Sequence, residues 1–319
     1  MTPVVLLLAL LTACQSSPEW VHAYGARHPL AGSIHDTAQN RPVGEKELLA
    51  RVAEADFVLI GESRDNLDHR RLEALLIAAA GRRPLAAAAF EVIETDQQPV
   101  LVEHRHDDLA ALGRALHLEG GDAPLDTYGA VLAVARRTGA ELVAAGLPGS
   151  SVAAVMAGGT SALPAAFVVR TGLDRPLPPL LAAALERTIA AAYCGELGQD
   201  LLTRLAGVER ARDAGLADRL AAVAGRNRGV LIADRARVRK DWGAPWYLER
   251  LRPGARTVSI ALLEVEHVRE MPTIGVLYDY VWFTPGAHPP GSDGCRQPGG
   301  AAGEIEVRRI APMRPRHLS

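Results

Sequence analysis

The chain has 319 residues, of which 48% are hydrophobic, 23% charged and only 4% aromatic, and its formal net charge at pH 7 is −2. This composition is typical of a globular protein that is long enough for one large domain with an insertion. The balanced charge excludes the strongly basic surface of nucleic-acid-binding proteins, so we expect no nucleic-acid partner.

The first residues have the pattern of an export signal. Positions 2–13 are apolar and end in Leu11-Thr12-Ala13-Cys14, which reads as a lipobox. The stretch is too short to span a bilayer and fits a signal peptide over residues 1–13. We therefore expect Cys14 to be lipidated, residues 14–40 to form a tether, and the protein to be anchored in the cell envelope, at the outer membrane if its source has two membranes. The alternative is a buried N-terminal strand with an ordinary cysteine.

Short apolar runs alternate with helical stretches over residues 41–284. The predicted strands are Phe57–Ile60, Leu85–Phe90, Glu141–Ala145, Ala165–Val169, Gly229–Ala233, Thr257–Val265 and Tyr278–Thr284. Such alternation predicts an α/β fold with a mostly parallel sheet flanked by helices. Two regions near 95–128 and 175–222 have helical patterns without strands, which predicts a smaller helical insertion subdomain. Residues 285–319 are rich in glycine and proline and read as a tail.

Charged and polar side chains follow the first two strands. They are Glu62, Arg64, Asp65, Asn66, His69 and Glu91. Because ligands of parallel sheets bind outside the carboxyl ends of the strands, we expect these side chains to face one crevice, with Glu91 approaching from the strand next to Glu62. The alternative is a helix N-terminus, capped by Asp65 or Asn66, that carries solvated charges.

Several blocks of the sequence, taken in order, resemble the ChaN-like lipoproteins, the haem-binding-uptake members of the Tiki superfamily. The blocks are Gly61-Glu62-Ser63, Asp65-Asn66, Asp68-His69, Phe90-Glu91, Asp96-Gln97-Gln98-Pro99, Cys194-Gly195, Arg210-Ala211-Arg212-Asp213, Val238-Arg239-Lys240-Asp241-Trp242-Gly243 with Pro245, and Asp279-Tyr280-Val281-Trp282-Phe283. The resemblance implies binding of haem or a similar anionic apolar ligand for iron or haem acquisition. It also implies, as partners, a second copy of the chain in a homodimer and an outer-membrane haem receptor or transporter.

The chain departs from the family pattern at three histidines. Family members usually have histidine at the positions of Arg64 and Arg70, and in a turn that reads Asp234-Arg235-Ala236-Arg237 here, whereas His69 is kept. Arginine stays protonated and is not a metal ligand, so we expect no bound metal ion. Two alternatives to a haem binder remain: a hydrolase with Glu62 and Glu91 as acid and base, and a member that kept the fold and lost the ligand.

A basic run follows the strand Gly229–Ala233. Arg235, Arg237, Arg239 and Lys240 place four positive charges within six residues. The run is either a solvated surface or an anion-binding rim, because guanidinium groups pair well with carboxylates such as haem propionates. Trp242, Pro245, Trp246 and Tyr247 come next and either cover the end of the sheet or form one wall of a haem slot.

Haem also requires an axial ligand, for which the candidates are His69, Tyr128 and Tyr193. The predicted cofactor-binding residues are therefore Glu62, Arg64, Asn66, His69, Glu91, Tyr128, Tyr193, Arg237 and Arg239. If Cys14 carries the lipid, then Cys194 and Cys295 remain, and an even pair in an exported protein favours a disulfide over two buried thiols.

Overall fold

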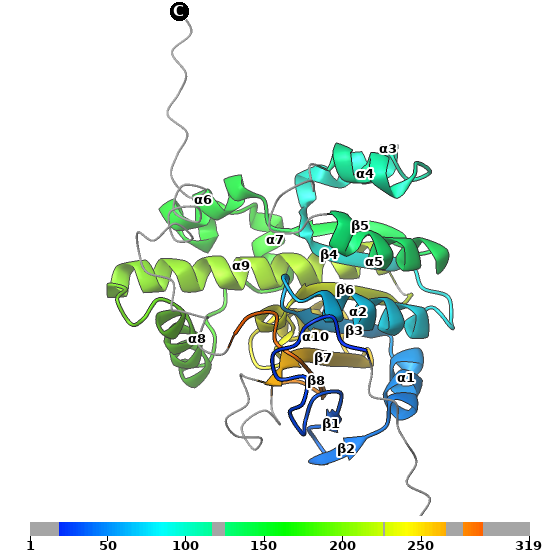
Figure 1. The fold of residues 1–319 in the computed structure, drawn as a ribbon. Coiled ribbons are helices and arrows are strands. Elements are labelled where there is room, and N and C mark those ends of the chain that lie inside the picture. The colour runs from blue at the N-terminus through cyan, green and yellow to red at the C-terminus, as the bar shows by residue number, and fades with distance from the viewer. Residues whose placement is uncertain (1–18, 117–124, 226, 266–276, 290–319) are drawn as a thin grey trace, which may run out of the picture.

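The computed structural model describes residues 19–116, 125–225, 227–265 and 277–289, and these form an α/β fold around one eight-stranded sheet (Figure 1). The strands are β1 (Ile34–Asp36), β2 (Arg41–Val43), β3 (Phe57–Glu62), β4 (Ala87–Glu94), β5 (Glu141–Gly146), β6 (Gly229–Asp234), β7 (Thr257–Glu264) and β8 (Tyr280–Thr284). Their order in the sheet is β2-β1-β8-β7-β3-β6-β4-β5. The six strands from β8 to β5 run parallel, and β1 and β2 are antiparallel, so the predicted mostly parallel sheet is confirmed.

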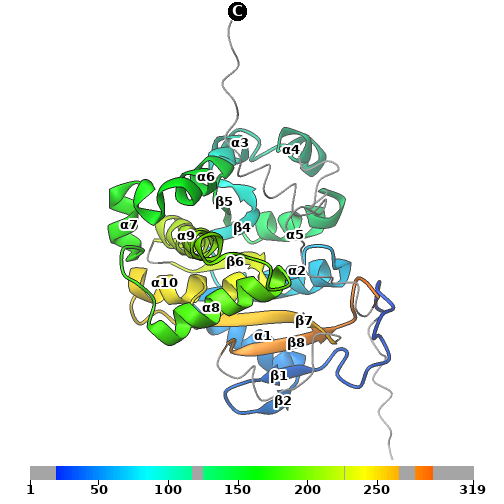
Figure 2. The same cartoon turned by 90° about the vertical axis from the view of Figure 1, so that its left-hand side faces the viewer.

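Helices cover both faces of the sheet (Figure 2). The helices are α1 (Glu45–Glu54), α2 (Leu67–Ala80), α3 (Gln98–Glu103), α4 (Leu109–Ala115), α5 (Leu125–Arg137), α6 (Gly149–Gly158), α7 (Ala165–Thr171), α8 (Pro179–Ala192), α9 (Gln199–Ala224) and α10 (Ala244–Leu251). One face of the sheet packs against apolar side chains of α1, α2 and α5. The other face packs against apolar side chains of α6, α7, α9 and α10. Strands buried on both faces explain the continuous apolar runs in the sequence.

Helix α8 and the first half of α9 extend past the strands as a small helical subdomain (Figure 1). Its own apolar cluster contains Leu185 and Ile189 of α8, Leu202 and Leu205 of α9, and Trp242, which follows β6. The second half of α9 packs on the sheet instead. The subdomain therefore lies at the carboxyl edge, by which we mean the edge of the sheet where its parallel strands end.

Two predicted strands differ from the structure. Ala165–Val169 is not a strand but the start of helix α7, which begins after Pro164 and ends at Gly172 in a left-handed conformation with φ +74°. An apolar run of five residues has no periodicity that separates the two structures, so the prediction was wrong. Strand β4 continues to Glu94, past the predicted end at Phe90, and its register with β5 shifts in between, so Glu91 lies inside the strand.

The N-terminal segment returns to the carboxyl edge. The backbone N–H groups of Val21 and His22 donate to the Asp68 carboxylate at 2.9 and 3.0 Å, and Tyr24 forms a bridge with Gly286. Part of the predicted tether forms β1. The predicted signal peptide, Cys14 and Cys295 lie outside the described residues. Among the helices of the described ranges, none is long and apolar enough to cross a membrane.

Candidate functional site

A close contact at the end of β3 brings the first loop and the basic run together. A Cβ on Gly61 would lie 2.4 Å from a methyl group of Val238 and 2.7 Å from the Cα of Arg235. Glycine therefore lets the 3-10 turn Arg235–Val238 cross directly over the strand. As a result, the Arg235 guanidinium donates to the Ser63 hydroxyl at 3.2 Å.

Glu62 and Glu91 do not face one crevice. Strand β6 lies between β3 and β4, so the expectation that Glu91 comes from the strand next to Glu62 is wrong. Side chains alternate along a strand. Glu62 accordingly points to the face covered by α2 and α5, where it meets Tyr128, and Glu91 points to the face covered by α9.

The first charge cluster, the Glu62 network, consists of Glu62, Arg70, Glu73 and Tyr128. Arg70 forms ion pairs with Glu62 and, at 2.7 Å, with Glu73. The Tyr128 hydroxyl donates to Glu62 Oε1 at 2.5 Å, and the Arg70 guanidinium lies 3.9 Å from the centre of the Tyr128 ring. All four residues are buried. Arg70, which occupies a family histidine position, is thus sealed between two carboxylates.

Burial determines the protonation of the Glu62 network. It raises the pKa of Glu73 well above the usual range, and the nearby Glu62 carboxylate raises it further. It also raises the pKa of Tyr128, with Glu62 as the second cause. Two carboxyl groups around one arginine therefore hold a proton on Glu73, and Tyr128 keeps its phenolic proton.

The second cluster, the Glu91 network, consists of Glu91, Arg237, Glu209, Asp213 and Arg64. Arg237 is buried and forms ion pairs with Glu209, with Asp213 at 3.3 Å and with Glu91 at 3.5 Å. Glu91 also accepts a hydrogen bond from the Asp234 backbone N–H at 2.8 Å. On its outer side Glu91 pairs with Arg64 at 3.3 Å, and the Arg64 side chain is 39% exposed. This network therefore reaches solvent through Arg64.

The arginines keep Glu91 ionised. Burial alone would raise the pKa of Glu91, but Arg64 and Arg237 lower it below the usual value. Burial raises the pKa of Glu209 and Arg237 lowers it, and the net result is a lowered pKa. At Asp213 the effect of burial is larger than that of Arg237, so the pKa lies well above its usual range. A carboxylate held in its charged form is a poor general acid. With Glu62 sealed on the opposite face, this geometry argues against the hydrolase alternative.

Two predicted binding residues tie the first loop to the ends of β7 and β8. Buried His69 accepts a hydrogen bond at Nδ1 from the Ser63 N–H at 2.9 Å, and its Nε2 lies 2.9 Å from the Thr284 hydroxyl. Burial lowers the pKa of His69 to about 3, so the ring is neutral and both nitrogens are engaged. Asn66 caps α2, as predicted, and donates to Glu264 at 2.6 Å. Both side chains hold the loop in place.

The remaining predicted residues lie beside the helical subdomain. Arg239 donates to both carboxylate oxygens of Asp241, at 3.0 and 2.7 Å, and lies 3.6 Å above the Trp242 ring. Trp242 packs in the cluster of α8 and α9, and Tyr193, the residue after α8, packs against the same cluster. Tyr193 is half-buried, unlike His69 and Tyr128. Cys194 is disulfide-bonded, but its predicted partner Cys295 lies outside the described residues, so that pairing stays a prediction.

Three acidic residues of the networks were not predicted as site residues, although Asp213 stands in one of the blocks that resemble the family. Glu73 lies three positions after Arg70 on α2, a spacing that places both on one helix face and offered a signal. Glu209 and Asp213 share one face of α9, but no pattern in the sequence connects them to Arg237, 24 or more positions away.

The carboxyl edge carries permanent cations and a half-buried phenol. Arg64 and Arg239 are the cations, and Tyr193 supplies the phenol. In the described ranges no group of three or more His, Cys, Asp or Glu side chains is placed to hold a metal ion. Fold and site thus define an α/β protein with an arginine rim under a helical subdomain.

Comparison with known proteins identifies the family. The model of the family described as haem-binding uptake, Tiki superfamily, ChaN matches residues 48–248, and the chain belongs to this family. A solved structure described as cofacial haem binding to ChaN of Campylobacter jejuni has a TM-score of 0.63 and 17% identity, over 80% of this chain and 97% of that one. The type III effector HopBA1 has a TM-score of 0.44 and 14% identity, over 75% and 91%. No curated protein sequence matches the chain.

Proposed function

We propose that the protein binds haem, or a similar anionic apolar ligand, at the carboxyl edge beneath the helical subdomain, and that it serves haem or iron acquisition. The observation that carries this proposal is the Arg64 side chain, which is 39% exposed and pairs on its inner side with Glu91, itself paired with the buried Arg237. The family and the haem bound by the similar ChaN structure agree with it.

In this proposal the arginines and Tyr193 have different roles in binding haem. Arg64 pairs with a propionate, and such a charge-assisted hydrogen bond contributes roughly 1.5 to 3 kcal/mol. Arg239 would have to exchange Asp241 for the second propionate, because it already donates to both carboxylate oxygens of Asp241. Arg237 acts indirectly, because its guanidinium is already committed to three carboxylates. Tyr193 is the preferred axial ligand, since it is half-buried, whereas His69 and Tyr128 are fully buried.

An absorbance titration of the purified protein with hemin tests the proposal. Saturable binding should shift the Soret band of hemin, and Tyr193→Phe should alter that band, whereas Tyr128→Phe should leave it unchanged. Identical Soret bands for wild type and Tyr193→Phe would remove Tyr193 as the ligand. A wild type that binds no hemin would refute the proposal and favour a member that kept the fold and lost the ligand.

We further propose that Cys14 is lipidated and anchors the protein in the cell envelope, at the outer membrane where the source has one. Cys14 and Trp20 are six positions apart, a stretch that spans at most about 20 Å. Because the segment that begins at Trp20 docks at the carboxyl edge, the anchor would hold the haem site near the membrane, where a receptor or transporter could exchange haem with it. Wild-type protein should partition into detergent, and a processed, soluble Cys14→Ser product would refute lipidation.

We also propose that two copies of the chain form a homodimer. Two edges with arginine rims repel each other when empty, so bound haem should promote the dimer by neutralising them. Sedimentation analysis with and without hemin tests this expectation. An equal dimer fraction in both conditions would contradict it.

A further inference from the structure

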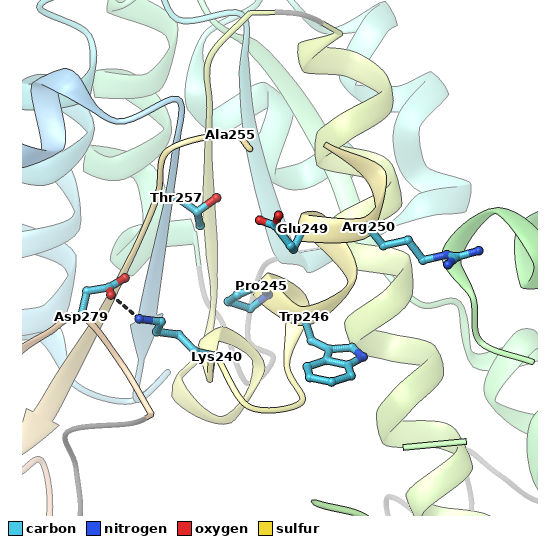
Figure 3. Close-up of a pocket in the computed structure, with 8 residues that line it drawn as sticks. All are labelled: Lys240, Pro245, Trp246, Glu249, Arg250, Ala255, Thr257 and Asp279. Atoms are coloured by element: carbon cyan, nitrogen blue, oxygen red, sulfur yellow. Dashed lines mark hydrogen bonds and ion pairs between the residues drawn. The ribbon is translucent and has the colours of Figure 1, made fainter. Parts of the chain in front are cut away.

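A groove lies along α10 and the first residues of β7, at the opposite end of β7 from Glu264 (Figure 3). It has a volume of about 610 Å³. Its lining residues are Lys240, Pro245, Trp246, Glu249, Arg250, Ala255, Thr257 and Asp279. Arg64, Arg239 and Tyr193, which are proposed to meet haem, are not among them, whereas Pro245 and Trp246 belong to the stretch that the sequence offered as a possible wall of a haem slot.

The groove combines an exposed aromatic ring with polar groups. Trp246 is 41% exposed, whereas Trp242 and Trp282 are buried. Figure 3 shows the Glu249 carboxylate and the Thr257 hydroxyl turned toward each other, with Trp246 at one end of the groove and Arg250 directed away. Glu249 is anchored by a hydrogen bond from the Gly254 N–H at 3.3 Å.

Two of the charged groups in the lining neutralise each other. Lys240 and Asp279 form an ion pair at 2.5 Å, and Asp279 also accepts from the Ser259 N–H at 2.9 Å. Arg250 turns out of the groove and donates to the Val169 carbonyl, so Glu249 is the carboxylate that faces the groove. This lining disfavours an anion, and its hydrogen-bonding groups disfavour a purely apolar ligand.

We propose that this groove binds a neutral saccharide. A pyranose ring has an apolar face of C–H groups that can stack on an indole, and hydroxyl groups around its rim. Glu249 would accept hydrogen bonds from sugar hydroxyls, Thr257 can both donate and accept, and Lys240 donates. One stacking platform with three polar side chains predicts weak binding, with a dissociation constant on the order of 1 mM.

The test is a titration of the full chain, ¹⁵N-labelled at tryptophan, with triacetylchitotriose and with maltotriose, followed by NMR of the indole N–H signals. The signal that disappears in Trp246→Phe should move saturably with at least one of these sugars. In calorimetry, Trp246→Ala should weaken that binding at least tenfold and Glu249→Gln at least threefold. Trp20→Ala is the matched control, since Trp20 lies on the N-terminal segment, and it should change nothing.

Three results would overturn the proposal. The Trp246 signal could stay unmoved by both sugars up to about 20 mM, a range well beyond the expected affinity. Choline chloride could move it while the sugars do not, which would indicate a cation site. Trp20→Ala could weaken sugar binding as much as Trp246→Ala does. The far-ultraviolet circular dichroism spectrum serves as a check of folding in each variant and should be the same as in the wild type.

Discussion

The two charge networks of this protein show how burial decides what an arginine does. Arg70 and Arg64 both stand where family members usually have histidine. Arg70 has a side chain that is 5% exposed and lies between two buried carboxylates, whereas Arg64 is 39% exposed and meets one. The first is therefore an internal counter-ion, and the second is a cation that a ligand can reach.

The networks also differ in how they balance charge. Glu62 and Glu73 share a single arginine, so the network holds a proton to avoid an unpaired buried charge. Glu91 lies between two arginines and stays ionised. We infer that the Glu62 network stabilises the fold and that the Glu91 network presents Arg64 at the carboxyl edge.

The largest expected effect comes from Arg70→Met, which leaves Glu62 and Glu73 without their counter-ion. Breaking a buried ion pair in this way should lower the free energy of unfolding by about 3 to 5 kcal/mol. Urea unfolding followed by circular dichroism measures the loss. Arg71→Met is the matched control, because Arg71 is exposed on the same helix and should cost less than about 1 kcal/mol. Equal losses in the two variants would contradict the sealed network.

The next effect concerns pH and has opposite signs in the two networks. The pKa of Glu73 is raised by folding, so its contribution to stability is complete below its unfolded pKa of about 4.3 and is lost as the pH rises through the folded pKa. The pKa of Glu91 is lowered, so its contribution is complete above about 4.3 and is lost as the pH falls through the folded pKa.

Glu73→Gln should therefore flatten the decline in stability above pH 4.3, and Glu91→Gln should flatten the decline below it, each by at most about 1.4 kcal/mol per pH unit. Unfolding free energies measured from pH 3 to pH 8 compare the two. Exposed Glu103→Gln serves as the control and should follow the wild type. If the pH dependence of the unfolding free energy changed on the same side of pH 4.3 in both variants, the opposite pKa shifts of Glu73 and Glu91 would be refuted.

The smallest effect on stability is expected for Arg64→Met. The pair with Glu91 is partly exposed, and such pairs typically contribute 0.2 to 1 kcal/mol. The urea midpoint of this variant should lie close to that of the wild type, with an unchanged m-value. A loss above about 2 kcal/mol would mean that Arg64 supports the fold as Arg70 does.

The sequence predicted the layers of this fold better than it predicted its site. Runs such as Phe57–Ile60 and Gly229–Ala233 are apolar because the sheet is covered on both faces, and such runs can be recognised in the sequence alone. The placement of Glu91 could not be predicted, because β6 comes from a segment 143 positions away and enters the sheet between β3 and β4. Strand order depends on long-range pairing that leaves no periodic signal.

The roles of single side chains were harder still to predict. His69 occupies a motif position that suggests a ligand, yet both of its ring nitrogens bond within the loop and to β8. Arg237 belongs to a run that reads as a surface rim, yet Glu209 and Asp213 of α9 enclose it. In each case the partner lies on an element distant in the sequence, and only the packing of that element decides between exposure and burial.

The central claim, that Arg64 faces a ligand, is tested most directly by hemin titrations of the wild type and Arg64→Glu, with Arg71→Glu as an equally charged control. Arg64→Glu should weaken hemin binding by roughly 1.5 to 3 kcal/mol, about 10- to 150-fold, because it removes a charge-assisted bond to a propionate. Arg71→Glu should bind hemin as the wild type does. Equal affinities of the wild type and Arg64→Glu would contradict the account.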